Sequence, residues 1–286
     1  MLAATPQPEL AYIWEPFSPQ ARPGICPGPF DRWFEYVTEE NQAAFDGPVS
    51  DMLAYRYHPG AEIRSIRSPK DAGRFVRDWA VVSSRRRRRP IPLVKDPIAV
   101  FSSGWFADRF DARVLMLIRH PAAFTNSLLA KGWHHPFSDF VAQPTMMRDL
   151  FEHRADEIAR FAEVEQPLLD QSILLWNLIH EHIARCRAAR PDWLFRRHED
   201  LSREPVTGFQ DLYERFGLTW NDDTERVVRE HSGEGNPEVT VDAASHRRDS
   251  AMAVTAWKRR LEAGQIARVR EGTEPTWREF YGDDDW

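Results

Sequence analysis

The stretch that decides the fold is VLMLIRHPAAFTNSLL, residues 114–129. Its apolar beginning predicts a buried strand, and the spacing from Pro121 onward predicts a helix. Proline fits the first turn of a helix, where its missing N–H costs nothing. The strand therefore ends at Arg119 and turns at once into a helix that carries Ser127 in its second turn. A helix N-terminus, a guanidinium and a hydroxyl at such a turn together indicate a site for an anion such as phosphate.

The anion site is not the only interpretation of this turn. An arginine at a strand end also pairs with a nearby carboxylate, and spacing alone does not separate these two roles for Arg119. The formal net charge of the chain is -6, so the molecule offers no global positive field to an anion. Any anion would have to be held by local groups.

Length and composition are those of an ordinary globular protein. The 286 residues are 42% hydrophobic, which is enough for one large α/β domain with a sizeable core. The two cysteines, Cys26 and Cys186, are too few for a disulfide framework and lack metal-ligand spacing, which favours a reducing setting. The sequence has no signal-peptide pattern, and its longest apolar run, VLMLI, is too short to span a bilayer. We therefore expect a cytoplasmic protein without a membrane partner.

The order of the expected elements is typical of a parallel sheet with helices on both faces. Strands are expected at 9–17, 91–101, 113–118 and 192–201, the second with a break at Asp96-Pro97. Helices are expected at 30–45, 70–82, 121–131, 145–163, 168–189 and 208–217, with Gly217 at the C′ position of the last. No internal repeat or low-complexity linker divides the chain. A single domain over residues 1–286, with a helix-rich C-terminal half, is therefore expected.

A run of five arginines, Arg85–Arg89, precedes the strand expected at 91–101. Such a run can be a nucleic-acid patch or a localisation signal. We favour a solvated loop, because five adjacent arginines do not point to one helical face and the chain as a whole is acidic. The sequence therefore predicts no nucleic-acid partner.

The run VKDP…VLMLIRHPAAFTNS resembles the 3′-phosphate-binding motif of sulfotransferases that use 3′-phosphoadenosine 5′-phosphosulfate (PAPS). In that family a strand-end Arg and a Ser eight residues later hold the 3′-phosphate, and Arg119 and Ser127 have that separation. The family places a Lys 24 residues before the Arg, where this chain has Lys95. The resemblance implies a P-loop NTPase-like three-layer sandwich, in which a central parallel sheet is flanked by helices. It also implies PAPS as co-substrate, 3′-phosphoadenosine 5′-phosphate (PAP) as product, and no metal.

Two later segments are similar to the same family. RRHEDL, residues 196–201, looks like its Y-E-D-L strand, with His198 at the position of a Tyr that often contacts adenine. SHRRDSAMAVTAWKRRL, residues 245–261, resembles the late loop that closes over the 3′-phosphate. The likeness therefore covers roughly residues 9–281. Candidate phosphate ligands in the late loop are Arg247, Arg248 and Ser250.

The early segment LAYIWEPFSP, residues 10–19, resembles the stretch of carbohydrate-type and related bacterial sulfotransferases that faces the acceptor. This makes Glu15 the candidate general base, because the acceptor hydroxyl must lose its proton as it attacks sulfur. Lys95 is then the candidate cation at the sulfuryl oxygens. The catalytic His of cytosolic relatives would fall at Pro97, so that route is closed. A role of Glu15 as a cap or a surface acid stays open, with His134 as a second choice of base.

The 5′-phosphosulfate loop of the family, a P-K-S/R-x-G-T/S-type turn, has no counterpart in this sequence. No G-x-x-x-x-G-K-[ST] motif occurs either, which argues against a P-loop kinase. We expect the first strand and the loop to lie upstream of Met1, so that the domain is N-terminally truncated. Two hypotheses follow. The chain is a sulfotransferase acting on a hydroxyl of a carbohydrate or another small molecule, or it is a catalytically inactive relative that keeps only the 3′-phosphate site.

Overall fold

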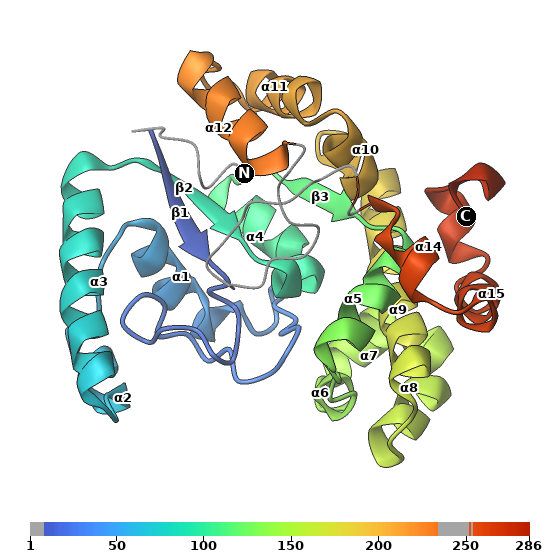
Figure 1. Ribbon diagram of the computed structural model, residues 1–286. Coiled ribbons are helices and arrows are strands. Elements are labelled where there is room, and N and C mark those ends of the chain that lie inside the picture. The colour runs from blue at the N-terminus through green and yellow to red at the C-terminus, as the bar shows by residue number, and fades with distance from the viewer. Residues whose placement is uncertain (1–8, 234–251, 253) are drawn as a thin grey trace. The chain divides into compact units, whose positions relative to one another are not determined.

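The computed structural model describes residues 9–233, 252 and 254–286, and the chain divides into two compact units. Of the described residues, the N-terminal unit comprises 9–112 and 139–149, and the C-terminal unit comprises 113–138, 150–233, 252 and 254–286. Among the described residues each unit contains one parallel pair of strands, and its other regular elements are helices (Figure 1). The fold is therefore mixed α/β and helix-rich, with small parallel sheets.

The sheet of the N-terminal unit pairs β1 (Leu10–Trp14) with β2 (Ile91–Lys95) in parallel, and Trp14 lies opposite Lys95. The buried side chains of β1 join an aromatic core that includes Phe17, Phe30 and Trp105. Stacking of Phe17 on Phe30, with ring centroids 4.3 Å apart, fixes the chain just after β1. The other elements are η2 (Gln42–Ala44), α1 (Asp46–Leu53), α2 (Pro59–Ser65), α3 (Pro69–Arg88), η3 (Pro97–Ser102), α4 (Ser103–Phe110), α6 (Ser138–Val141) and α7 (Pro144–Leu150).

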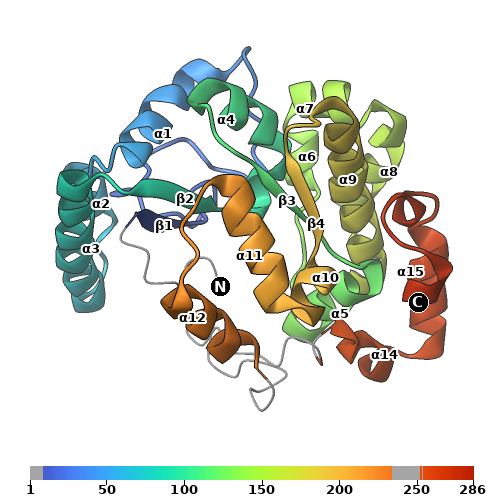
Figure 2. The ribbon, with the colours of Figure 1, turned by 90° about the horizontal axis from the view of Figure 1, so that it is seen from above.

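The sheet of the C-terminal unit pairs β3 (Leu115–Ile118) with β4 (Leu194–Arg197), again in parallel. Helices α5 (Pro121–Lys131) and α9 (Leu168–Ala189) lie side by side (Figure 2). Between them the buried hydroxyl of Ser172 donates to Thr125 Oγ1 at 3.0 Å. The other elements are η4 (Glu152–Arg154), α8 (Ala155–Glu163), α10 (His198–Arg203), α11 (Pro205–Phe216), α12 (Asp222–Ser232), α14 (Ala256–Arg260), α15 (Ala263–Gly272), η5 (Thr276–Glu279) and η6 (Asp283–Asp285).

The strand-to-helix turn at Arg119 forms as the sequence predicts. Helix α5 begins at Pro121, and the Nδ1 atom of His120 accepts a hydrogen bond from the N–H of Ala122 at 3.3 Å. Gly132 ends the helix with a φ of 60°, a conformation that glycine adopts without a Cβ penalty. The predicted helix at 121–131 is therefore confirmed to the residue, and one of its first N–H groups is already bonded to the His120 ring.

The helix predicted over residues 30–45 is wrong. The periodic apolar residues Phe30 and Val37 are buried, as the pattern requires, but the backbone between them runs in turns. Its N–H groups bond to distant side chains instead of to helical carbonyls. The N–H of Trp33 donates to Asp139 at 2.9 Å, and that of Tyr36 donates to Gln143 at 2.8 Å. Because the N–H groups of Trp33 and Tyr36 already have acceptors, a helix would add no hydrogen bond at these two residues.

The arginine run is not a loop, contrary to the prediction. Helix α3 continues through Arg88 and ends at Arg89, which has a φ of 52°. Cations in a last turn face the negative end of the helix dipole, which offsets part of their mutual repulsion. The guanidinium of Arg85 is also half-buried and donates to the carbonyl of Tyr12 at 3.0 Å. Residues 85–88 are therefore the last turn of a 20-residue helix.

Several other predicted boundaries change, and three of them are instructive. The strand predicted at 91–101 ends at Lys95, and the short helix η3 follows the expected break at Pro97. The helix predicted over 145–163 is interrupted at the fully buried Phe151, whose ψ of 17° is not that of an α-helix. The strand predicted at 192–201 ends at Arg197, and helix α10 begins at His198. In each case the predicted element exists and a tertiary contact or a cap sets its end.

The described residues contain two short sheets where the sequence predicts one central sheet. In each of them a helix follows a strand within three residues of its carboxyl end. No helix in the described part of the chain is both long and apolar enough to cross a membrane.

Candidate active site

Glu15 and Lys95, the two predicted catalytic residues, form an ion pair at the carboxyl ends of β1 and β2. Glu15 has a φ of 43°, which a residue with a side chain seldom adopts. Its N–H continues the sheet by donating to the carbonyl of Lys95 at 3.0 Å. The side chains of Glu15 and Lys95 remain 28% and 51% exposed. A ligand can therefore reach a carboxylate and an ammonium at one point.

Asp96, directly after Lys95, fixes the turns that carry this pair. Its Oδ2 accepts from the N–H of Phe17 at 2.7 Å, and its Oδ1 accepts from the N–H of Ile98 at 3.0 Å. Burial raises the pKa of Asp96 to about 6, against the lowering effect of these two hydrogen bonds, and the charge of Glu15 raises it further. Asp96 thus ties the turn after β1 to the turn after β2 and acts as a positioning residue.

In the C-terminal unit, the main chain of Arg119 is held on both sides. Its N–H donates to Nε2 of His180 at 3.4 Å, and its carbonyl accepts from Nε1 of Trp176 at 2.9 Å. Burial lowers the pKa of His180 to about 3, so its ring is neutral and Nδ1 donates to the carbonyl of Trp176 at 2.9 Å. The two rings stack 4.0 Å apart, which fixes the residue from which the guanidinium extends.

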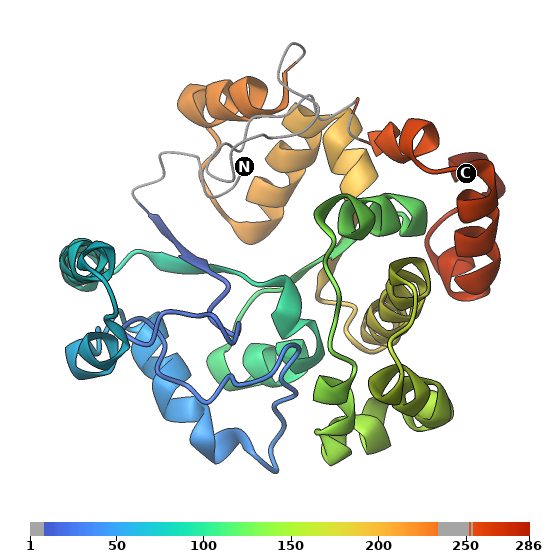
Figure 3. The ribbon, with the colours of Figure 1, turned by 60° about the horizontal axis from the view of Figure 1, so that its bottom comes forward.

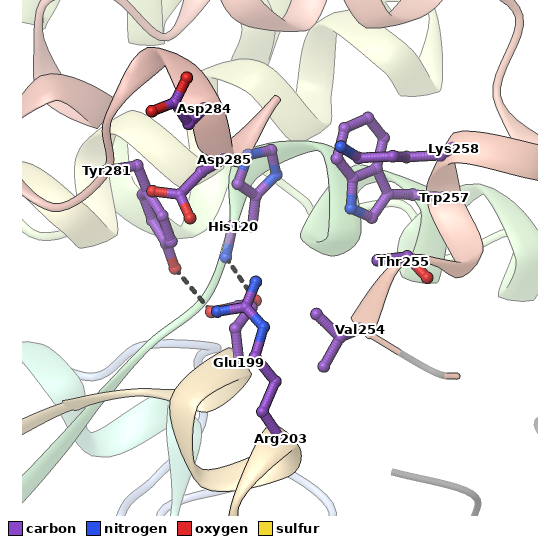
Figure 4. A pocket seen from close by; sticks show the side chains of 10 residues that line it. All are labelled: His120, Glu199, Arg203, Val254, Thr255, Trp257, Lys258, Tyr281, Asp284 and Asp285. Carbon is purple, nitrogen blue, oxygen red and sulfur yellow. Dashed lines mark hydrogen bonds between the residues drawn. The ribbon is translucent and has the colours of Figure 1, made fainter. Parts of the chain in front are cut away.

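The ends of β3 and β4 are joined by a buried carboxylate. Glu199, the second residue of α10, is 4% exposed and accepts from the N–H of His120 at 3.0 Å. The hydroxyl of Tyr281 donates to its other oxygen at 2.9 Å, as Figure 4 shows. Burial and the neighbouring carboxylate both raise the pKa of Tyr281, which keeps the phenol protonated. This arrangement mirrors the Asp96 contacts at the end of the other sheet.

The ring of His120 lies among aromatic side chains. It stacks on Trp257 with centroids 4.9 Å apart and meets the edge of Trp286 at 4.5 Å. Because burial lowers its pKa to about 3, the ring is neutral, and its Nδ1 already accepts from Ala122. The proton therefore sits on Nε2, which has no hydrogen-bond partner among the described residues.

A cavity of about 60 Å³ borders this cluster (Figure 4). Its lining carries both signs of charge, with two cations beside three carboxylates. The volume suits one or two water molecules and falls well short of a nucleotide. The cavity is therefore too small to hold a nucleotide. Its lining residues are His120, Glu199, Arg203, Val254, Thr255, Trp257, Lys258, Tyr281, Asp284 and Asp285.

The other predicted site residues lie in the C-terminal unit. Ser127 is half-buried in the second turn of α5. His198 begins α10, and its Nδ1 is 3.5 Å from the hydroxyl of Ser202. His134, the second choice of base, is exposed, and its Nδ1 lies 3.1 Å from Nε2 of Gln171. The remaining predicted ligands, Arg247, Arg248 and Ser250, lie outside the described residues.

Several residues of these clusters were not predicted from the sequence, and Asp96 and Tyr281 show why. Asp96 had a usable signal, since an Asp before a Pro is typical of a helix cap, and the structure shows it capping η3. Tyr281 had none, because its partner Glu199 lies 82 residues earlier in the chain. Sequence spacing alone does not bring two such residues together.

Within the described ranges, no group of three or more His, Cys, Asp or Glu side chains is placed to hold a metal ion. Comparison of the chain with family models, curated proteins and solved structures finds no match.

Proposed function

We propose that this chain is a sulfotransferase that moves a sulfuryl group from PAPS to a hydroxyl of a carbohydrate or another small molecule. The observation that carries the proposal is the pairing of Glu15 with Lys95 at the carboxyl ends of two parallel strands. Ligands of open α/β sheets bind at that edge. A base and a cation side by side are what transfer of a negatively charged group to a hydroxyl requires.

Each residue has a defined role in the proposed reaction. The acceptor oxygen forms a bond to sulfur while the bond between sulfur and the 5′-phosphate oxygen breaks, and PAP leaves. Glu15 takes the proton of the acceptor hydroxyl. Lys95 moves from Glu15 to the sulfuryl oxygens when PAPS binds, which frees the carboxylate to act as a base.

The nucleotide is assigned to residues of the C-terminal unit. Arg119 and Ser127 would bind the 3′-phosphate, and His198 would contact the adenine. Two facts suit this assignment: Arg119 directly follows a strand, and its main chain is fixed by His180 and Trp176. Arg247, Arg248 and Ser250 would complete the phosphate site. The proposed fold is the P-loop NTPase-like three-layer sandwich, with which the two parallel strand pairs are compatible.

The test is release of PAP from PAPS in the presence of a panel of mono- and oligosaccharides. We expect acceptor-dependent release by the wild-type chain. Glu15→Gln should lower turnover on the order of 100-fold while nucleotide affinity stays within about twofold, because only proton transfer is lost. Glu39→Gln, at an exposed carboxylate of the same unit, is the matched control and should keep full activity. Full activity of Glu15→Gln would remove Glu15 from the mechanism.

A second candidate function is nucleotide binding without catalysis. It is favoured by the ion pair itself, in which Glu15 and Lys95 neutralise each other, and by the lack of a 5′-phosphosulfate loop motif in the sequence. This candidate predicts tight PAP binding with no PAP release under any acceptor. An assay of PAP release together with a measurement of PAP binding therefore distinguishes the two functions.

A further inference from the structure

Helices α2 and α3 carry a concentration of positive charge that the rest of the chain lacks. Residues 64–89 contain ten basic and two acidic side chains, a net charge of +8, in a chain whose total is -6. Figures 1 and 3 draw α3 along one border of its unit, with α2 beside its first turn. The charge is therefore local and displayed along one helix pair.

Most of these cations are not neutralised. Within the described part of the chain, Arg64, Lys70 and Arg86–Arg89 form no ion pair, although they are exposed. The acids nearby are already engaged. Asp78 is bound by Arg22 and by Arg77, the second at 3.1 Å. This leaves a row of free guanidinium groups with no acid of the described chain to bind them.

The same helix exposes an apolar stripe. Val76 is 59% exposed and Trp79 is 53% exposed. They lie three residues apart on α3, Val76 on the side away from the packed residues Asp78 and Val82 and Trp79 at the edge of that side. Arg86 follows Trp79 by seven residues and Arg87 follows Val76 by eleven, spacings that return to the same helical face. Ile63 of α2 adds another exposed aliphatic side chain, at 55%. On α3, Val76 and Trp79 therefore share a face with Arg86 and Arg87.

We propose that this α2–α3 surface, made of Ile63, Val76, Trp79 and the cations of residues 64–89, binds the face of an anionic phospholipid membrane. A helix with basic residues beside Trp and aliphatic side chains lies in the headgroup region of such a membrane, its cations on the lipid phosphates and its apolar groups below them. A nucleic acid would use the cations and could stack on Trp79, but it offers no apolar volume for Ile63 and Val76. The exposed aliphatic groups therefore favour lipid. The binding is peripheral and independent of the proposed catalytic site.

The proposal is tested by co-sedimentation of the full chain with vesicles of phosphatidylcholine, with and without phosphatidylserine. We expect binding only to the vesicles that contain phosphatidylserine, and its loss at high salt. The triple variant Arg86→Gln, Arg87→Gln, Arg88→Gln should bind on the order of 100-fold more weakly, at about fivefold per cation. The double variant Val76→Ser, Trp79→Ser should weaken binding on the order of tenfold or more at unchanged salt dependence.

Matched controls distinguish binding through this surface from non-specific binding to vesicles. Trp133→Ser removes a tryptophan of similar exposure in the C-terminal unit and should bind like the wild type. Circular dichroism and thermal unfolding show that each variant is folded. Equal binding to both vesicle types, no binding to either, or wild-type binding by both multiple variants would each overturn the proposal. Binding to an RNA or DNA oligonucleotide without vesicle binding would overturn it in favour of a nucleic-acid surface.

Discussion

Lys95 and Glu15 join the ends of two parallel strands through an ion pair between Nζ and Oε1, although they lie 80 residues apart in the sequence. The pair is half open to solvent, whereas the Asp96 carboxylate beside it is largely buried and bonded to backbone N–H groups on both turns. Lys95 and Asp96 therefore have different roles. Lys95 is available to a ligand, and Asp96 holds the turns after β1 and β2 in place.

These different roles predict that mutation of the two residues changes the free energy of unfolding by different amounts. Lys95→Ala should change the free energy of unfolding by less than about 1 kcal/mol, because an exposed ion pair contributes little. Asp96→Ala should lower it by about 2–3 kcal/mol, because two backbone N–H groups lose their acceptor. Urea unfolding followed by circular dichroism measures both. If the two variants were equally stable, the positioning role of Asp96 would be ruled out.

The stability should also fall in mild acid because His120 is buried and neutral. Burial lowers its folded-state pKa from 6.5 to about 3, so between these values the unfolded chain binds a proton that the folded chain does not. Stability is therefore lost as the pH falls from 6.5 towards 3, by about 3 kcal/mol at pH 4 from this residue.

Unfolding of the wild type and of His120→Asn across this pH range measures the effect. The variant keeps a side-chain acceptor for the N–H of Ala122, and its stability should fall less steeply with acid. Parallel curves for wild type and His120→Asn would show that His120 is not the group responsible.

Tyr281→Phe should destabilise the C-terminal unit by about 1–3 kcal/mol. The change leaves one oxygen of the buried Glu199 carboxylate without its donor. Tyr36→Phe is the control, because the hydroxyl of Tyr36 makes a long, exposed bond of 3.4 Å to Asp149. Thermal unfolding compares the two, and an equal, small effect would mean that the Tyr281 bond carries no net stability.

Two glycines predict changes of opposite sign. Gly217 ends α11 with a φ of 65° and has room for a Cβ, so Gly217→Ala should cost about 1 kcal/mol through backbone strain alone. Gly73 lies in the interior of α3 with open space where a Cβ would lie, so Gly73→Ala should stabilise by about 0.5–1 kcal/mol. Chemical unfolding of the two variants in parallel checks both signs.

Much of the local structure could be predicted from the sequence because local chemistry sets it. Pro121 and Gly132 mark the two ends of α5, and Gly217 marks the end of α11. The helix expected over 30–45 failed for a non-local reason. The N–H groups of Trp33 and Tyr36 bond to side chains more than 100 residues away, which no periodicity reveals.

The candidate site was predictable only as separate residues. Glu15 and Lys95 were assigned roles one by one from a resemblance, but their contact depends on the parallel register that sets Trp14 opposite Lys95. The loop predicted at the arginine run, residues 85–89, was wrong for a different reason. Charge repulsion argued for a loop, while the helix dipole and the carbonyl of Tyr12 support the last turn of α3.

The central claim is a site for the 3′-phosphate of the nucleotide, and calorimetric titration tests it most directly. The chain is titrated with PAP and with adenosine 5′-phosphate, which differ only in that phosphate. We predict that PAP binds at least about tenfold more tightly, since charge-assisted phosphate contacts contribute about 1.5–3 kcal/mol each. Arg119→Ala should abolish the preference, while Arg226→Ala, which removes an arginine paired only within α12, should keep it. Equal affinity for the two nucleotides, or an unchanged preference in Arg119→Ala, would contradict the account.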